Sequence, residues 1–287
     1  MIKFNKTKKA IFLSLLCLFF SGLPVLAGES ITVTRSDGEK IPLRVYSPDT
    51  KECPPVAIFS PGAGGTERGY RYIGEGLSRQ GWLTLVVGHK ESGPGTLRNE
   101  VFASGLHEGL YKMVTNPDLQ RSRLMDIDGA LKWVEADCKH PYKVLLGHSM
   151  GTDIVMFEAG AANKLGVAGG RDRFDAYVAL SASGPGSIFA DDSWKSIRKP
   201  MLILTGTKDK GLEGTWKWRT RPFEVLPPGC KWLGVINGAS HMNFAGIGMS
   251  GKTERLSLQT ISLFLNGAKN GDCRIPPPIP GIEISEK

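Results

Sequence analysis

Short apolar runs alternate with helical patterns along most of this chain, and this alternation constrains the fold more than any other feature. Strands are expected in "WLTLVVG" (82–88), "YKVLLGH" (142–148), "FDAYVALSA" (174–182), "KPMLILTG" (199–206) and "CKWLGVING" (230–238). Helical spacing occurs over residues 68–81, 118–137, 152–166 and 254–268. Strands without polar alternation are typical of parallel sheets that helices cover on both sides. The sequence therefore predicts an α/β fold with a mostly parallel central sheet and helices on both faces.

Three further segments complete the predicted organisation. Residues 31–48 contain two alternating runs around Asp37-Gly38, which is typical of a β-hairpin. A long excursion, rich in Gly and Ser, runs from His89 to Pro117. The tail "PPPIPGIEISEK" (276–287) is rich in proline and is expected to pack loosely or to be disordered. Because no repeat or long linker divides the chain, one domain is expected over residues 28–275.

The first 27 residues have the composition of an export signal. A basic leader precedes an apolar run that Gly22 and Pro24 interrupt, and Val25 and Ala27 supply small residues before a cleavage site. An uncleaved membrane anchor is the alternative, although the apolar run is short for a span. We expect residues 1–27 to be a signal peptide, cleaved after Ala27. The mature chain is then periplasmic or secreted, without a stable membrane span.

Charge and cysteine content narrow the class of protein. Removing residues 1–27 removes four lysines and no acids, so the formal charge falls to 36 − 4 − 28 = +4. Without a clustered basic face, this excess does not indicate nucleic-acid binding. Four of the five cysteines remain, and an even number in an exported chain predicts two disulfides, with free buried thiols as the alternative. The sequence shows no zinc-ligand spacing, phosphate loop or cofactor motif, so we expect no metal and no cofactor.

The stretch "GHSMG" (147–151) follows one of the predicted strands and precedes a predicted helix. In a nucleophile elbow the strand turns so sharply into the helix that the serine backbone is strained. Residues two positions to either side must then lack a side chain. Gly147 and Gly151 occupy those positions. A glycine-rich turn with a solvated serine is the alternative, but the strand–turn–helix context favours Ser149 as a nucleophile.

A serine nucleophile needs a base, and the base needs an orienting carboxylate. Asp209 follows the strand "MLILTG", and His241 follows the strand "KWLGVIN". Parallel strands bring both loops to the edge where Ser149 lies, in the chain order Ser, Asp, His. The sequence predicts Asp209 as the acid and His241 as the base. Fallback acids are Glu213 and Asp191.

The oxyanion of a tetrahedral intermediate needs preorganised N–H donors. One donor is expected from the residue after the nucleophile, Met150. The second is expected from the glycine-rich loop that follows the strand in "PPVAIFSPGAGG" (54–65). We predict the Ala63 N–H as this second donor, with the Gly64 N–H as the alternative.

With these residues the chain resembles the α/β-hydrolases, and more narrowly their dienelactone-hydrolase-like and platelet-activating-factor-acetylhydrolase-like branch. The matching pieces include "LLGHSMG", "LILTGTKDKG" and "GASHMNFAG", and the resemblance extends from about Phe59 to Gly246. It implies the α/β-hydrolase fold and an ester hydrolase with Ser149 as nucleophile. Two positions depart from relatives: dienelactone hydrolases use a cysteine nucleophile, and the oxyanion loop here begins Pro61-Gly62 rather than His-Gly.

The resemblance also implies the disulfide pairing and the kind of substrate. In this fold the strands ending at Ser60 and at Gly147 are neighbours, which implies pairs Cys53–Cys138 and Cys230–Cys273. Only about twenty residues separate Ser181 from Met201, too few for a large lid, which favours small or short-chain acyl esters. Trp216 and Trp218 are candidates for a binding groove or for packing.

An exported serine esterase acting on small-molecule carboxylic esters is the function we expect. A peptidase or acyltransferase on the same triad, or a non-catalytic binding protein on this scaffold, are the alternatives.

Overall fold

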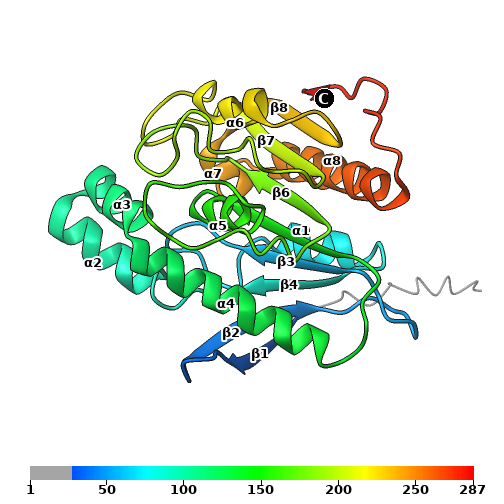
Figure 1. The fold of residues 1–287 in the computed structure, drawn as a ribbon, viewed down its shortest axis with the longest axis horizontal. Helices are drawn as coiled ribbons and strands as arrows, with labels where there is room; N and C mark the ends of the chain where they lie inside the picture. The colour runs from blue at the N-terminus through cyan, green and yellow to red at the C-terminus, as the bar shows by residue number, and fades with distance from the viewer. Residues whose placement is uncertain (1–27) are drawn as a thin grey trace, which may run out of the picture.

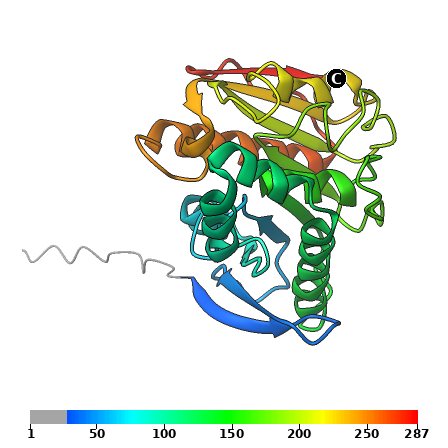
Figure 2. The same cartoon turned by 90° about the vertical axis from the view of Figure 1, so that its left-hand side faces the viewer.

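The computed structural model describes residues 28–287, which form one nine-stranded sheet with helices on both faces (Figure 1). The strands are β1 (Glu29–Thr34), β2 (Lys40–Tyr46), β3 (Val56–Ser60), β4 (Leu83–Val87), β5 (Lys143–His148), β6 (Ala176–Leu180), β7 (Met201–Lys208), β8 (Lys231–Ser240) and β9 (Ile282–Glu286). Their order in the sheet is β1-β2-β4-β3-β5-β6-β7-β8-β9. In Figure 2 the β1–β2 hairpin lies at one end of the sheet and β8–β9 at the other.

The middle of the sheet is parallel, as the continuous apolar runs predict. Strands β4, β3, β5, β6, β7 and β8 pair in parallel, each with the next. Every residue of β3, β4 and β6 is buried, because helices cover both faces. The outer pairings β1–β2, β2–β4 and β8–β9 are antiparallel. The predicted hairpin at Asp37-Gly38 is present, and Gly38 has φ 91° in its turn.

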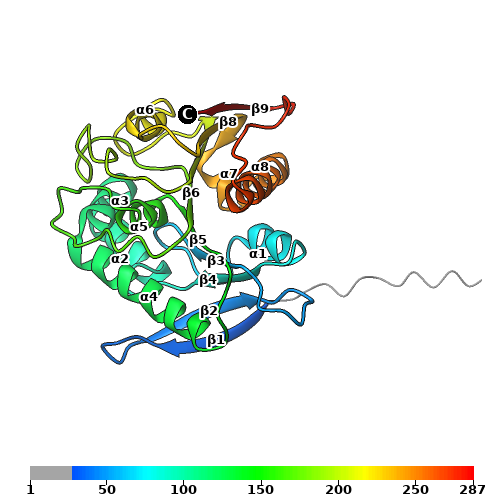
Figure 3. The same cartoon turned by 45° about the vertical axis from the view of Figure 1, so that its right-hand side comes forward.

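The helices fall into two groups on opposite faces of the sheet (Figure 3). They are α1 (Arg71–Ser78), α2 (Pro94–Ser104), α3 (Leu106–Thr115), α4 (Pro117–Glu135), α5 (Met150–Glu158), α6 (Arg221–Val225), α7 (His241–Phe244) and α8 (Gly251–Asn270), with a 3-10 turn at Trp218–Thr220. Helices α4 and α5 pack over one apolar core, and α1 and α8 over the other. Helix α5 ends earlier than its apolar pattern predicts, since Gly160 turns the chain with φ 97°.

The excursion from His89 to Pro117 is more regular than its Gly and Ser content suggests. It folds into α2 and α3, which meet at Gly105, a residue with φ 80°. Pro94 begins α2, where its missing N–H costs nothing. The two helices lie beyond the carboxyl ends of the parallel strands, at the left of Figure 1.

The prediction of a loosely packed tail over 276–287 is wrong for its second half. Residues 282–286 form β9 and pair with β8 from Trp232 to Ile236. Ile282 is buried in the same core as α8. The proline content of residues 276–280 misled the prediction, because those prolines lie in the connection that leads to the strand and leave its N–H groups free to pair.

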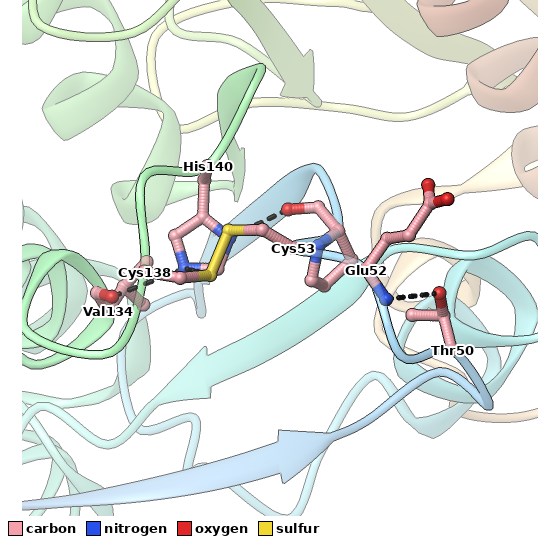
Figure 4. Close-up of a disulfide and its surroundings, with 7 residues drawn as sticks. Thr50, Glu52, Cys53, Val134, Cys138 and His140 are labelled. Carbon is pink, nitrogen blue, oxygen red and sulfur yellow. Dashed lines mark hydrogen bonds between the residues drawn. A yellow bond between two sulfur atoms is a disulfide. The ribbon is translucent and has the colours of Figure 1, made fainter.

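Both implied disulfides are present. Cys53 is bonded to Cys138, and Cys230 to Cys273. The first links the segments that lead into the neighbouring strands β3 and β5. The imidazole of His140 lies against it, with Nδ1 2.7 Å from the Pro54 carbonyl oxygen and Nε2 3.2 Å from that of Val134 (Figure 4). This corner therefore ties the end of α4 to the start of β3.

Two expectations about export fall partly outside the structure. The predicted signal peptide, residues 1–27, lies outside the described residues. Within residues 28–287, no helix combines the length and the apolar character needed to cross a membrane.

The packing of β9 gives a direct test. We expect Ile282→Ala to lower the free energy of unfolding by about 2 kcal/mol or more, because a buried aliphatic side chain is lost from the core. Glu283→Ala, at the neighbouring exposed position, is expected to change it by less than about 0.5 kcal/mol. Urea unfolding of both variants checks this difference, and equal midpoints would show that the tail does not pack as a strand.

Candidate active site

Ser149 lies at the sharp turn from β5 into α5, with φ 53° and ψ −124°. A residue other than glycine rarely adopts a positive φ, so this backbone is strained. A Cβ on Gly147 would lie 2.3 Å from the Gly151 carbonyl oxygen, and one on Gly151 would lie 1.9 Å from that of Ser60. Both glycines are therefore required by backbone contact, and the turn has the geometry of a nucleophile elbow.

The structure brings Ser149, His241 and Asp209 together. His241 directly follows β8 and Asp209 directly follows β7, so both lie at the carboxyl edge of the sheet, as predicted. The Ser149 Oγ is 3.0 Å from His241 Nε2, and His241 Nδ1 is 2.9 Å from Asp209 Oδ1. The result is a continuous hydrogen-bonded chain from hydroxyl to carboxylate.

The exposure of His241 and the burial and charge of Asp209 suit the roles of base and orienting carboxylate. The His241 side chain is 28% exposed and that of Asp209 is 0% exposed, so substrate can reach the imidazole but not the carboxylate. Burial raises the pKa of Asp209, but the hydrogen bond from His241 and the charge of Arg219 outweigh burial and hold the pKa below its usual range. Asp209 is therefore ionised at neutral pH and can accept the Nδ1–H of His241.

Arg219 is a buried partner of this chain that sequence reasoning missed. Its Nε is 2.9 Å from Asp209 Oδ1, and the same guanidinium donates to the carbonyl oxygens of Ser181 and Ala182. Further donation to the carbonyl of Lys210 fixes the loop that carries Asp209. An arginine in the stretch "WKWRTR" gives no sequence signal, because only the fold turns it toward the carboxylate.

The loop after β3 lies against Ser149. A Cβ on Gly62 would come 3.2 Å from the Ser149 Cβ. The Gly62 N–H donates to the Tyr70 hydroxyl, and the Gly64 N–H donates to the Ser92 carbonyl, so both are already engaged. Among the hydrogen bonds of residues 28–287, none uses the Ala63 N–H.

His148 and Tyr70 connect three loops of the site. The Tyr70 hydroxyl accepts from the Gly62 N–H and donates to His148 Nδ1, at 2.8 Å, because the other ring nitrogen, Nε2, faces a carbonyl oxygen and carries the hydrogen. His148 Nε2–H then donates to the His241 carbonyl, at 3.2 Å. Burial lowers the pKa of His148 well below its usual value, so the ring is neutral.

The remaining sequence candidates lie on the walls of the site or away from it. Leu97 of α2 packs so closely on the loop that a Cβ at Gly64 would meet its Cδ2 at 2.3 Å. Trp218 is a packing residue, since its indole N–H donates to the Pro185 carbonyl. The fallback acid Glu213 accepts from the Ser187 hydroxyl, and the fallback acid Asp191 is exposed on the chain between β6 and β7.

One group of potential metal ligands occurs in the described residues, namely Cys53, Cys138 and His140. The two sulfur atoms are joined in a disulfide, so they are not thiolate ligands in this state. The group also lies at the opposite ends of β3 and β5 from Ser149, and it has no part in the candidate active site.

Comparison with known proteins gives the fold. No family model matches the sequence, and no curated protein matches it. Among solved structures, the chain is similar to the esterase domain of a Rhodothermus marinus protein, with TM-score 0.56 and 15% identity over 84% of this chain and 98% of that one. It is also similar to Est1E from Butyrivibrio proteoclasticus, with TM-score 0.56 and 15% identity over 83% of this chain and 99% of that one. The chain thus shares their mixed α/β fold with a mostly parallel central sheet.

The elbow makes a prediction about backbone space. We expect Gly151→Ala to lower the free energy of unfolding by about 3 kcal/mol or to prevent folding, because its methyl group would overlap the Ser60 carbonyl. Gly251→Ala is the matched control, since a Cβ there meets nothing within 4 Å. Thermal unfolding checks both variants, and equal tolerance of the two alanines would contradict the close approach of the β3 loop to α5.

Proposed function

We propose that this protein is a serine hydrolase that cleaves carboxylic esters through an acyl-enzyme. The chain of hydrogen bonds from Ser149 through His241 to Asp209, begun by a serine in a strained elbow, is the observation that carries the proposal. The names of the two similar structures, an esterase domain and Est1E, are consistent with it.

In the acylation step, Ser149 Oγ attacks the carbonyl carbon of the ester while its proton passes to His241 Nε2. The imidazolium that forms is stabilised by the ionised Asp209. The tetrahedral intermediate then collapses, the bond from carbon to the alcohol oxygen breaks, and His241 returns the proton to that oxygen. An alcohol leaves, and the acyl group remains on Ser149.

In the deacylation step, water repeats the attack. His241 Nε2 takes a proton from the water as it adds to the acyl carbon, and returns a proton to Ser149 Oγ as the serine leaves. The products are a carboxylic acid and the free enzyme. An alcohol or amine in place of water would make the same intermediate an acyltransferase, so the acceptor distinguishes hydrolase from transferase.

Both tetrahedral intermediates carry an oxyanion, for which we propose the N–H groups of Met150 and Ala63 as donors. Met150 begins α5, so its N–H lies at the positive end of the helix dipole. Ala63 is favoured over Gly64 because the Gly64 N–H already donates to the Ser92 carbonyl. Preorganised donors of this kind stabilise the transition state more than the bound ester.

Small or short acyl groups are the substrates we propose. No helix lies between β6 and β7 in the described chain, so a large helical lid is absent from that segment. Leu97 of helix α2 packs against the loop after β3, which limits the space beside Ser149. The dienelactone-hydrolase-like branch and export to the periplasm or the medium are likewise proposals, the latter in keeping with two disulfides.

Turnover of p-nitrophenyl esters of increasing acyl length tests the activity. With residues 28–287 in oxidised form, we expect the highest kcat/KM on the shortest chains and a fall of roughly 10⁴-fold or more in Ser149→Ala, since the nucleophile is lost. A fluorophosphonate probe should label the wild type and not the variant. A folded wild-type protein that neither turns over esters nor takes the label would favour a binding protein. Turnover of peptide substrates in preference to esters would favour a peptidase.

Arg219 provides a second test. Its charge lowers the pKa of Asp209, so Arg219→Met raises that pKa, and the part of the acidic limb of kcat/KM that comes from protonation of Asp209 moves to higher pH. We also expect kcat at pH 7 to fall by about 10- to 100-fold, because the Asp209 loop loses its fixed position. Arg219→Lys keeps the charge and should move the acidic limb less. A pH profile in Arg219→Met identical to that of the wild type would show that the guanidinium does not act on the triad.

A further inference from the structure

Arg123 of α4 is a fully buried arginine beside the loop after β3. Its Nη1 donates to the Pro61 carbonyl at 2.7 Å, and its Nη2 donates to the Gly62 carbonyl at 3.1 Å. Its Nε donates to the Ser92 hydroxyl at 2.8 Å. Within residues 28–287, no carboxylate lies within ion-pair distance of this guanidinium. Arg123 therefore binds the loop through neutral acceptors.

A buried, unpaired guanidinium destabilises the folded protein, which indicates that Arg123 has a function other than packing. Burial lowers the pKa of Arg123 to about 10, the direction that loss of water imposes on a cation. An apolar side chain of similar volume would fill the same space without this penalty. The function of the guanidinium therefore lies in the two carbonyl groups that its planar fork holds.

A second Ser–His–Asp chain supports the same loop from within the core. Ser60 Oγ is 2.8 Å from His89 Nε2, and His89 Nδ1 is 2.8 Å from Asp126 Oδ2. At the Asp126 end of this hydrogen-bonded chain, Arg35 Nη1 donates to Asp126 Oδ1 at 3.0 Å. The three side chains of Ser60, His89 and Asp126 are almost fully buried, so substrate cannot reach this serine. The chain instead fixes the last residue of β3, from which the loop starts.

Because Arg123 fixes the directions of the Pro61 and Gly62 carbonyl groups, it also fixes the direction of the Ala63 N–H. In a planar trans peptide, the carbonyl of one residue and the N–H of the next point in opposite directions. Because the Pro61 carbonyl points at Arg123, the Gly62 N–H must point away, and it does so by donating to Tyr70. The Gly62 carbonyl also points at Arg123, so the Ala63 N–H points away as well.

The side away from Arg123 is the side of the nucleophile. The Tyr70 hydroxyl that receives the Gly62 N–H is bonded to His148, the neighbour of Ser149. Gly62 itself lies against the Ser149 side chain. A cation on both carbonyl oxygens also polarises these peptides and strengthens their N–H groups as donors.

We propose that Arg123 is the positioning residue of the oxyanion site: by holding the Pro61 and Gly62 carbonyls, it aims and polarises the Ala63 N–H toward the reacting carbonyl oxygen. The inference rests on the proposed ester hydrolysis at Ser149. It assigns to α4, the helix that precedes β5 in the chain, a role in stabilising the transition state.

An ester and its thionoester analogue separate this role from a loss of stability. Sulfur is a weaker hydrogen-bond acceptor than oxygen, so an oxyanion site makes the wild type prefer the oxygen ester. In Arg123→Met we expect kcat for the oxygen ester to fall by roughly 10- to 100-fold, with KM little changed, because the donor acts in the transition state. Turnover of the thionoester should fall much less, so that the preference shrinks. Arg123→Lys keeps the charge but loses the two-pronged guanidinium, so its preference for the oxygen ester should lie between those of the wild type and Arg123→Met.

Arg173→Met is the matched control, since Arg173 binds Glu158 and Asp128 and touches neither carbonyl of the loop. It should lower the melting temperature and keep the full preference for oxygen. If Arg123→Met does not fold, Ser92→Ala removes only the Nε partner and should show the same change to a smaller extent.

The outcomes separate the two proposals. An active wild type whose folded Arg123 and Ser92 variants retain the full preference would overturn the role of Arg123. A wild type that neither turns over esters nor reacts with the fluorophosphonate would instead remove the proposed function on which that role rests.

Discussion

The contact between the backbone of α5 and the end of β3 governs the architecture of the site. With no side chain at Gly151, the first turn of the helix lies against the Ser60 carbonyl, and the β3 loop lies against Ser149. The parallel pairing of β3 with β5 sets this approach, since Ser60 is opposite Gly147 in the register. A sheet that separated these strands, or a larger residue at the turn, would move the candidate oxyanion donor away from the nucleophile. The charged residues around this contact hold the β3 loop in its position beside Ser149.

Two buried arginines each hold one loop of the site. Arg219 fixes the loop that carries the candidate acid, and Arg123 fixes the loop that carries the candidate oxyanion donor. Arg219 donates mainly to backbone carbonyl groups, whereas Arg123 donates to two carbonyl groups of the β3 loop and to the hydroxyl groups of Ser60 and Ser92. Between them, the neutral His148 and the Tyr70 hydroxyl connect the β3 loop to the loop of His241. The loops are thus preorganised by polar contacts, while the apolar cores position the strands that carry them.

The sequence predicted what depends on local pattern and missed what depends on tertiary contact. Apolar runs gave the parallel strands, and the order of strand ends placed Ser149, Asp209 and His241 at one edge. Arg123, Arg219 and Tyr70 carry no such signal. A charged residue in a helix or loop is expected at the surface, and an aromatic one in the core, and only the tertiary structure shows that these three contact the site. The strand at residues 282–286 was missed because the prolines before it dominated the composition. Helices α2 and α3 were hidden in the same way by glycine and serine.

The late position of β9 has a consequence for how the chain is made and handled. Strand β8 has β7 on one side and β9 on the other, and β9 is formed by residues 282–286 of a 287-residue chain. Until residues 282–286 pair, the edge of β8 is open, and open edges pair readily with other chains. Lys287 also takes part, since its N–H donates to the Lys231 carbonyl. Loss of residues 282–287 by truncation or proteolysis would therefore leave β8 as an exposed edge of the sheet.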